Sequence, residues 1–148
     1  MTETLFVDLY RSHPELSPGE QQALVERQFP SLVPRTPLHL WSPGDPIAER
    51  GRRVLVGVAT YSGQDMELLD RIGEALNRSK TAARVDVFNT LDCRTHEDFA
   101  KYVPGFGDVY QTPVVGVWLD GTLQEAGSGY QGRLILARAL GLELSPRA

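Results

Sequence analysis

The sequence predicts an α/β fold, a four-stranded mixed sheet flanked by helices, with an N-terminal helical extension. Three observations predict it. Between residues 53 and 142, short apolar runs of strand length alternate with longer amphipathic stretches. An Asp120-Gly121 pair is a strong turn signal between the last two of these runs. Residues 1–50 are rich in proline and differ in character from the rest of the chain.

The strands are expected where aliphatic residues run without interruption. Residues 54–59 form a continuous apolar run, which is typical of a strand buried on both faces. Residues 85–88 and 114–119 are the next two strands, and residues 123–126 follow the Asp-Gly turn. A helix between the first two strands predicts a parallel pair with a right-handed crossover, and the turn predicts an antiparallel final pair.

Three helices complete the order β-α-β-α-β-β-α. The first helix carries apolar residues at helical spacing, which are Met66, Leu68, Leu69, Ile72, Ala75 and Leu76. Thr95 is expected to cap a second, short helix, and residues 131–140 form a third that ends at Gly141. The first helix also carries acidic residues that are expected to form a solvated face, which are Glu67, Asp70 and Glu74.

Two domains are predicted: a proline-rich helical extension over residues 1–50 and the main domain over residues 51–148. The extension is expected to wrap onto the main domain. A short helix is expected within residues 3–10, and residues 38–41 have the composition of a short strand. We therefore expect the extension to form local structure outside the four-stranded sheet.

A longer helix of the extension has a clear start signal. Ser17 is a good N-cap, Pro18 suits the first helical position, and Glu20 can close a capping box. Because the residue before a proline disfavours helical geometry, this helix is expected to end at or before Phe29, ahead of Pro30.

Charge and composition exclude several classes of function. The 148-residue chain has a formal net charge of −4, which argues against nucleic-acid binding because phosphate contacts need a basic face. No segment approaches the length of a membrane span, and the N-terminal residues do not read as a signal peptide, so a cytoplasmic location is expected. With one cysteine and three dispersed histidines, the sequence predicts no metal site. It also predicts no cofactor.

Two local patterns stand out. Thr112-Pro113 precedes a strand that ends in Asp-Gly, and Tyr61-Ser62-Gly63-Gln64-Asp65 follows the first strand. Together with the order of elements, these patterns resemble the thioredoxin superfamily over residues 53–142. The resemblance implies a cis proline at Pro113 and places Ser62 and Asp65 where that superfamily carries its redox cysteine pair.

The departures from that superfamily exclude dithiol chemistry. Exchange with a disulfide requires a thiolate, and neither Ser62 nor Asp65 can supply one. The resemblance also implies a buried acid in the first strand, where this chain has Val56. Dithiol oxidoreductase activity is therefore not expected.

What replaces the cysteines has a structural interpretation. Ser62 and Asp65 have the spacing of a capping box, in which each side chain would accept a hydrogen bond from the other residue's main-chain N–H. An alternative is a glutathione-binding site at Ser62, because a helix N-terminus favours an anion. Asp65 would oppose it by adding negative charge to the same turn, and the helical second domain of such transferases has no counterpart after Leu142.

The resemblance also implies a groove that can bind without chemistry. Tyr61, Thr112, Pro113 and Tyr130 would border it, with Gly63 and Gln64 at the helix start. The main chain of Thr112 could pair with an extended peptide, and the two tyrosines could anchor it. We therefore expect a protein or peptide partner in a chaperone-like, adaptor or assembly role. A homodimer is a further option.

Cys93 offers a different hypothesis, a thiol-dependent enzyme or redox sensor. It lies just before a predicted helix start, where the helix, Arg94 and His96 would lower its pKa and Asp92 would raise it. The competing interpretation is a packed cysteine without reactivity. The two interpretations differ in the pKa and burial of the thiol.

Overall fold

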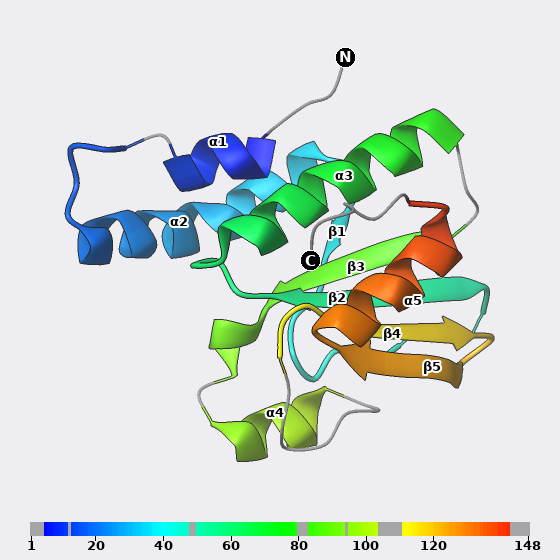
Figure 1. Cartoon of the computed structure of the whole chain (residues 1–148). Helices are drawn as coiled ribbons and strands as arrows, with labels where there is room; N and C mark the ends of the chain where they lie inside the picture. Colours follow the sequence, from blue (N-terminus) through cyan, green and yellow to red (C-terminus); the bar gives the residue numbers. More distant parts are fainter. Residues whose placement is uncertain are drawn as a thin grey trace.

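The computed structural model describes residues 5–11, 13–47, 50–79, 83–93, 95–103 and 111–142. A five-stranded sheet runs through the middle of the molecule in the order β1-β3-β2-β4-β5, and helices cover both of its faces (Figure 1). The predicted α/β architecture is confirmed, with one more strand than expected.

The central strands form from the predicted apolar runs. Their bounds are β2 (Arg52–Val58), β3 (Arg84–Asn89), β4 (Val114–Leu119) and β5 (Thr122–Ser128). As predicted, β2 pairs with β3 in parallel, and β4 pairs with β5 antiparallel. Asp120 and Gly121 make the turn between β4 and β5 with φ values of 51° and 82°, the left-handed geometry that a tight hairpin requires.

The prediction of four strands is wrong by one. β1 (His39–Leu40) lies at the edge of the sheet and pairs in parallel with β3, opposite Asp86 and Val87. The sequence shows strand-forming residues here but no usable period, because two residues are too few to display alternation. The extension therefore contributes an edge strand to the sheet.

Two apolar clusters lie on opposite faces of the sheet. One face carries four helices, which are α1 (Leu5–Arg11), α2 (Pro18–Leu32), α3 (Gly63–Ser79) and α5 (Tyr130–Leu140). The other face carries α4 (His96–Tyr102; Figure 1). Phe99 of this helix belongs to the second cluster. Short 3-10 turns follow α2 and β3, which are η1 (Val33–Arg35) and η2 (Thr90–Asp92). Among the described helices, none is long and apolar enough to cross a membrane.

The predicted start of α2 is confirmed and its predicted end is wrong. Ser17 and Glu20 form the reciprocal capping box, but the helix continues through Pro30 to Leu32. A proline inside a helix removes one hydrogen bond. Leu32 and Val33 compensate because both are buried in the larger cluster, and Val33 N–H still donates to the carbonyl of Phe29.

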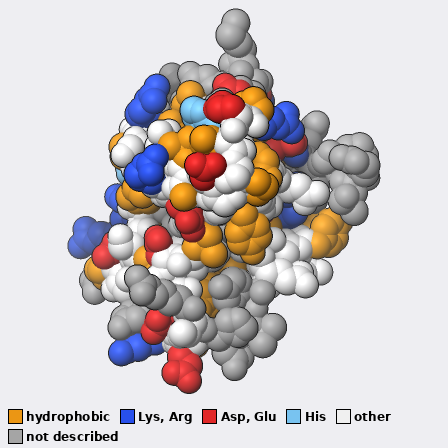
Figure 2. Space-filling view, turned by 90° about the vertical axis from the view of Figure 1, so that its left-hand side faces the viewer, with side chains coloured by type: hydrophobic (Ala, Val, Ile, Leu, Met, Phe, Trp, Pro, Cys, Tyr) orange, Lys and Arg blue, Asp and Glu red, His pale blue; other side chains and the backbone are white. Residues whose placement is uncertain are grey.

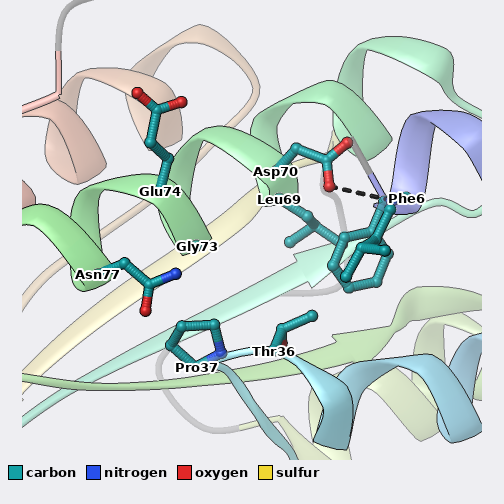
Figure 3. A pocket seen from close by; sticks show the side chains of 9 residues that line it. Phe6, Thr36, Pro37, Leu69, Asp70, Gly73, Glu74 and Asn77 are labelled. Carbon is teal, nitrogen blue, oxygen red and sulfur yellow. Dashed lines mark hydrogen bonds between the residues drawn. The ribbon is translucent and has the colours of Figure 1, made fainter. Parts of the chain in front are cut away.

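Asp70 is not on a solvated face, contrary to the sequence prediction. It is only 8% exposed, and its two carboxylate oxygens accept hydrogen bonds from the N–H groups of Phe6 and Val7, each at 3.0 Å. Figure 3 shows the Asp70 side chain directed at Phe6. The first amides of a helix lack partners within it, so Asp70 of α3 satisfies two N–H groups of the first turn of α1.

The extension shares the core of the main domain. Phe6 and Phe29 are each 1% exposed, with ring centroids 5.8 Å apart, and both belong to the same cluster as Val56 of β2 and Leu69 of α3. The division of the chain at residue 50 into two domains stays a prediction, which the first variant in the Discussion tests.

Candidate functional site

The start of α3 holds half of the predicted capping box. The hydroxyl oxygen of Ser62 accepts a hydrogen bond from Asp65 N–H at 3.2 Å, as predicted. The reciprocal bond differs: Asp65 accepts from Ala59 N–H at 3.0 Å, whereas Ser62 N–H donates to the carbonyl of Ala59 at 2.9 Å. Asp65 therefore ties the start of α3 to the end of β2, a longer reach than the sequence spacing suggests.

Asp65 is a buried acid in the first turn of α3. The residue is 2% exposed, and burial raises the pKa of its carboxyl. Hydrogen bonds from Ala59 N–H and the Thr112 hydroxyl, the positive charge of Arg133, and a hydrogen bond with Ser62 act in the opposite direction and are weaker. The carboxyl group thus bonds to the end of β2 and faces Thr112 and Arg133, which are distant in sequence.

The Thr112-Pro113 segment lies against the start of α5. The peptide bond between these two residues is cis. Gly129 N–H donates to the carbonyls of Gln111 and Pro113, at 3.2 and 2.9 Å. A Cβ atom on Gly132 would lie 2.7 Å from the Pro113 carbonyl oxygen, so α5 can approach this closely only with glycine there.

The main chain of Thr112 is available for pairing. Within the described residues, neither its N–H nor its C=O takes part in a main-chain hydrogen bond, although its neighbours Gln111 and Pro113 both do. The side chain is half-buried and faces Asp65. A main-chain donor and acceptor without partners at a sheet end are a template for an added strand.

Two exposed tyrosines belong to the same region. Tyr61, in the turn between β2 and α3, and Tyr130, at the start of α5, are each 60% exposed. We call the residues gathered here the candidate surface, which comprises Tyr61, Ser62, Gly63, Gln64, Asp65, Thr112, Pro113 and Tyr130. A hydrogen bond joins Ser62 and Asp65, and the Thr112 side chain faces the Asp65 carboxyl. It leaves the two tyrosines and Gln64 exposed.

Figure 2 looks onto the side of the molecule at which β2 ends and α3 begins. Apolar side chains gather in the middle of this face, among acidic and basic ones (Figure 2). A face of this mixed kind suits contact with another chain better than binding of a single highly charged ligand.

A polar network links the extension to the candidate surface, and sequence reasoning missed it. The Thr60 hydroxyl oxygen accepts hydrogen bonds from Gln22 of α2 at 3.0 Å and from Asn89 of β3 at 3.4 Å. Thr60 and Asn89 are buried, and Thr60 directly precedes Tyr61. No local pattern around Gln22 signals this contact, because the partner is 38 residues away in the chain.

Tyr10 is a second missed residue. A Cβ atom on Gly63 would lie 3.1 Å from Cε2 of Tyr10, so the tyrosine ring packs directly on the first turn of α3. The extension therefore reaches the candidate surface but leaves Tyr61 and Tyr130 uncovered. Gly63, which belongs to the motif that resembles the thioredoxin superfamily, therefore also leaves room for the Tyr10 ring.

Cys93 is a packed cysteine with a high pKa. It is 7% exposed and lies in the cluster with Phe88 and Phe99. Burial, followed by the negative charges of Asp92 and Asp98, raises the pKa of the thiol to about 11. The reactive-thiol hypothesis needs a lowered pKa at Cys93, and the structure gives a raised one. Arg94 and the side chain of His96, on which that hypothesis drew, lie outside the described residues.

Alkylation of Cys93 is expected to be slow at neutral pH. Because only the thiolate reacts, the rate with iodoacetamide should rise about tenfold for each pH unit. This rise should continue to near the pKa of about 11. The measurement is the rate of mass increase between pH 7 and pH 10 under native conditions. A rate that levels off below pH 8 would contradict the packed-cysteine interpretation and revive the thiol-dependent one.

Two cavities border α1, away from the candidate surface. The smaller, of about 90 Å³, lies between α1, α3 and the Thr36-Pro37 segment, as Figure 3 shows. The larger, of about 390 Å³, lies between α1 and α2 and is lined by residues that include Leu9 and Arg35. Among the described residues, no cluster of three or more His, Cys, Asp or Glu side chains could hold a metal ion.

Comparison of the fold with solved structures identifies it. The N21Q mutant thioredoxin from Halobacterium salinarum NRC-1 aligns with 76% of this chain and 96% of its own, at 20% identity and a TM-score of 0.50. The fold is thioredoxin-like. A second match comes from a structural study of the thiol resolving mechanism in yeast mitochondrial 1-Cys peroxiredoxin via glutathione/thioredoxin systems. The matched chain also has the thioredoxin-like fold. It aligns with 70% of this chain and 93% of its own, at 15% identity and a TM-score of 0.50.

A third thioredoxin-like match is part of a much larger protein. ERdj5 in crystal form I aligns with 80% of this chain but over only 14% of its own length, at 12% identity and a TM-score of 0.50. A scan of the sequence against protein-family models finds no match, and a comparison with curated proteins finds none either. The similarity therefore establishes the thioredoxin-like fold. With a single cysteine, the chain has no C-x-x-C pair.

Proposed function

We propose that this chain is a non-catalytic module that binds an extended peptide segment of a protein at the candidate surface. The observation that carries the proposal is the main chain of Thr112. Its N–H and C=O have no main-chain partner in the described part of the structure, and they lie at the end of the sheet where Tyr61 and Tyr130 are exposed. Such a peptide would add main-chain hydrogen bonds at Thr112.

The exposed tyrosines supply affinity that main-chain pairing alone lacks. A tyrosine buries a large apolar area and keeps a polar tip, and it loses few rotamers on binding. Tyr61 and Tyr130 are each 60% exposed, so much of each side chain is free to be covered by a partner. Aromatic residues of this kind dominate the energy of many protein interfaces.

A binding role does not require dithiol–disulfide exchange, for which this chain lacks the cysteine pair. A serine and a buried acid replace the redox pair, and the one thiol is packed with a raised pKa. The hydroxyl oxygen of Ser62 serves the main chain of α3, a structural use that does not require glutathione. We place the module among chaperone-like or assembly proteins of the cytoplasm, with a partner that is another protein or a second copy of this chain.

Fluorescence anisotropy tests the proposal with a defined probe. The probe is a short, fluorescein-labelled, threonine-rich peptide with one central leucine, because threonine favours the extended conformation. The wild-type protein is expected to bind it. The double variant Tyr61→Ala/Tyr130→Ala should weaken binding about tenfold or more, since interface tyrosines are frequent hot spots. Cys93→Ala should bind like wild type.

The control separates the candidate surface from general effects. Gln124→Ala changes an exposed residue of β5 that is outside the candidate surface, so its affinity should equal that of the wild type. Equal binding by the wild type and the double tyrosine variant would contradict the proposal. Loss of binding on Cys93→Ala would instead support the thiol-dependent alternative.

A further inference from the structure

The N-terminal extension brings a third tyrosine to the candidate surface. Tyr10 belongs to α1, outside the part of the sequence that resembles thioredoxins. Its ring packs on Gly63, with Cε2, Cζ and Cδ2 at 3.1, 3.5 and 3.7 Å from the place of a Cβ atom on that glycine. Gly63 lies two residues after Tyr61, so Tyr10 borders the same first turn of α3.

The position of Tyr10 depends on side chains that clamp α1 at both ends. At the N-terminal end, Asp70 of α3 accepts from the N–H groups of Phe6 and Val7 (Figure 3). At the C-terminal end, Nε2 of Gln21 in α2 donates to the Tyr10 carbonyl at 2.6 Å. A seven-residue helix is too short to persist alone in water, so these contacts and its buried residues determine where it lies.

The hydrogen bonds with Asp70 and Gln21 determine the orientation of α1 and stabilise it as a helix. Asp70 lies two turns along α3 from Gly63, and it holds the start of α1, whereas Gly63 contacts Tyr10 near the end of α1. The two helices therefore run antiparallel, with the last turn of α1 beside the first turn of α3. This arrangement places the half-buried ring of Tyr10 on Gly63, at the edge of the larger apolar cluster.

We propose that Tyr10 is a specificity-determining residue of the peptide site, an inference that rests on the function proposed above. A bound peptide that pairs with Thr112 and covers Tyr61 directs a side chain toward the first turn of α3, where Tyr10 forms a wall. An aromatic wall favours an aliphatic or aromatic side chain, because a polar one would lose its water there without gaining a partner. The partner segment is thus an extended peptide with an apolar residue at this position.

A pair of guest peptides tests this inference. The probe described above is compared with a second peptide whose central leucine is replaced by asparagine, which has a similar shape but a polar end. Wild type is expected to prefer the leucine peptide by about tenfold, in keeping with the burial of one leucine side chain. Tyr10→Ala should reduce that preference to about threefold or less, and Tyr10→Phe should retain it because the ring remains.

Asp70→Asn serves as a second variant that does not touch the peptide. Asparagine keeps the shape of the side chain but offers one acceptor oxygen for two amides and removes the negative charge at the start of α1. As a positioning residue, Asp70 should affect the ratio of the two affinities in the same direction as Tyr10→Ala. A purely structural role would lower both affinities together and leave their ratio unchanged.

The outcomes separate this inference from the proposed function. If wild type binds neither peptide, the proposed function fails and this inference fails with it. If wild type prefers the leucine peptide, and Tyr61→Ala/Tyr130→Ala abolishes binding while Tyr10→Ala keeps the full preference, the proposed function stands and the inference is wrong. Loss of preference in Tyr10→Ala, with retention in Tyr10→Phe, supports both.

Discussion

Replacing Phe29 with alanine is expected to lower the free energy of unfolding of the whole chain by about 3–5 kcal/mol, the usual cost of truncating a buried phenylalanine. Phe29 is 1% exposed and packs on Phe6 in the cluster that also holds residues of β2 and α3. The loss should appear in a single cooperative transition. Urea denaturation followed by circular dichroism and by tryptophan fluorescence measures it.

A neighbouring residue of α2 provides the control. Gln28→Ala changes an exposed side chain in the same helix, and its effect should lie within about 0.5 kcal/mol, as is usual for surface substitutions. A loss below about 1 kcal/mol for Phe29→Ala, or a separate early transition for the extension, would show two independent domains. Either result would support the sequence-based division at residue 50 against the shared core described here.

Asp65 is expected to give the next largest effect. Asp65→Ala removes the acceptor for the buried Ala59 N–H and should cost about 1–3 kcal/mol, the penalty for a buried donor without a partner. Asp65→Asn keeps an acceptor oxygen and removes the charge. At neutral pH the asparagine variant should therefore be more stable than the alanine variant. Urea denaturation at several pH values measures both.

The pH dependence of that comparison has a definite sign. Burial raises the pKa of Asp65 above its ordinary value of 3.8, so the folded state binds a proton that the unfolded chain has already released. As the pH falls through the raised pKa toward 3.8, wild type should gain stability relative to Asp65→Asn, and the gain should level off below that value. A wild type that loses stability relative to Asp65→Asn in this window would contradict a raised pKa.

Most strands and helices could be predicted from the sequence because their signals are local. The apolar run of β2, the Asp120-Gly121 turn and the Gly141 end of α5 each depend on neighbours in the chain. A short strand is expected within residues 38–41, but the place of β1 in the sheet could not be predicted because two residues show no period. Helix α2 continues past Pro30 because burial of Leu32 outweighs one lost hydrogen bond. Tertiary packing decided both cases.

The candidate site was predictable only in part. The motif spacing correctly indicated the cap from Ser62 to Asp65, a contact within one turn. Nothing in the sequence indicated that Asp65 bonds to Ala59, that Asp70 caps α1, or that Tyr10 packs on Gly63. The last two contacts depend on how the extension docks against α3, and the first depends on how the chain turns from β2 into α3; no local sequence pattern contains that information.

Nuclear magnetic resonance on the Cys93→Ala protein tests the central claim most directly, because no thiol is then present. The alanine keeps the buried site apolar. On titration with the leucine peptide, the amide signals of Tyr61, Thr112 and Tyr130 are expected to shift together and to saturate. Binding that leaves these three signals unchanged, or the absence of any binding without the thiol, would contradict a thiol-independent peptide site at the candidate surface.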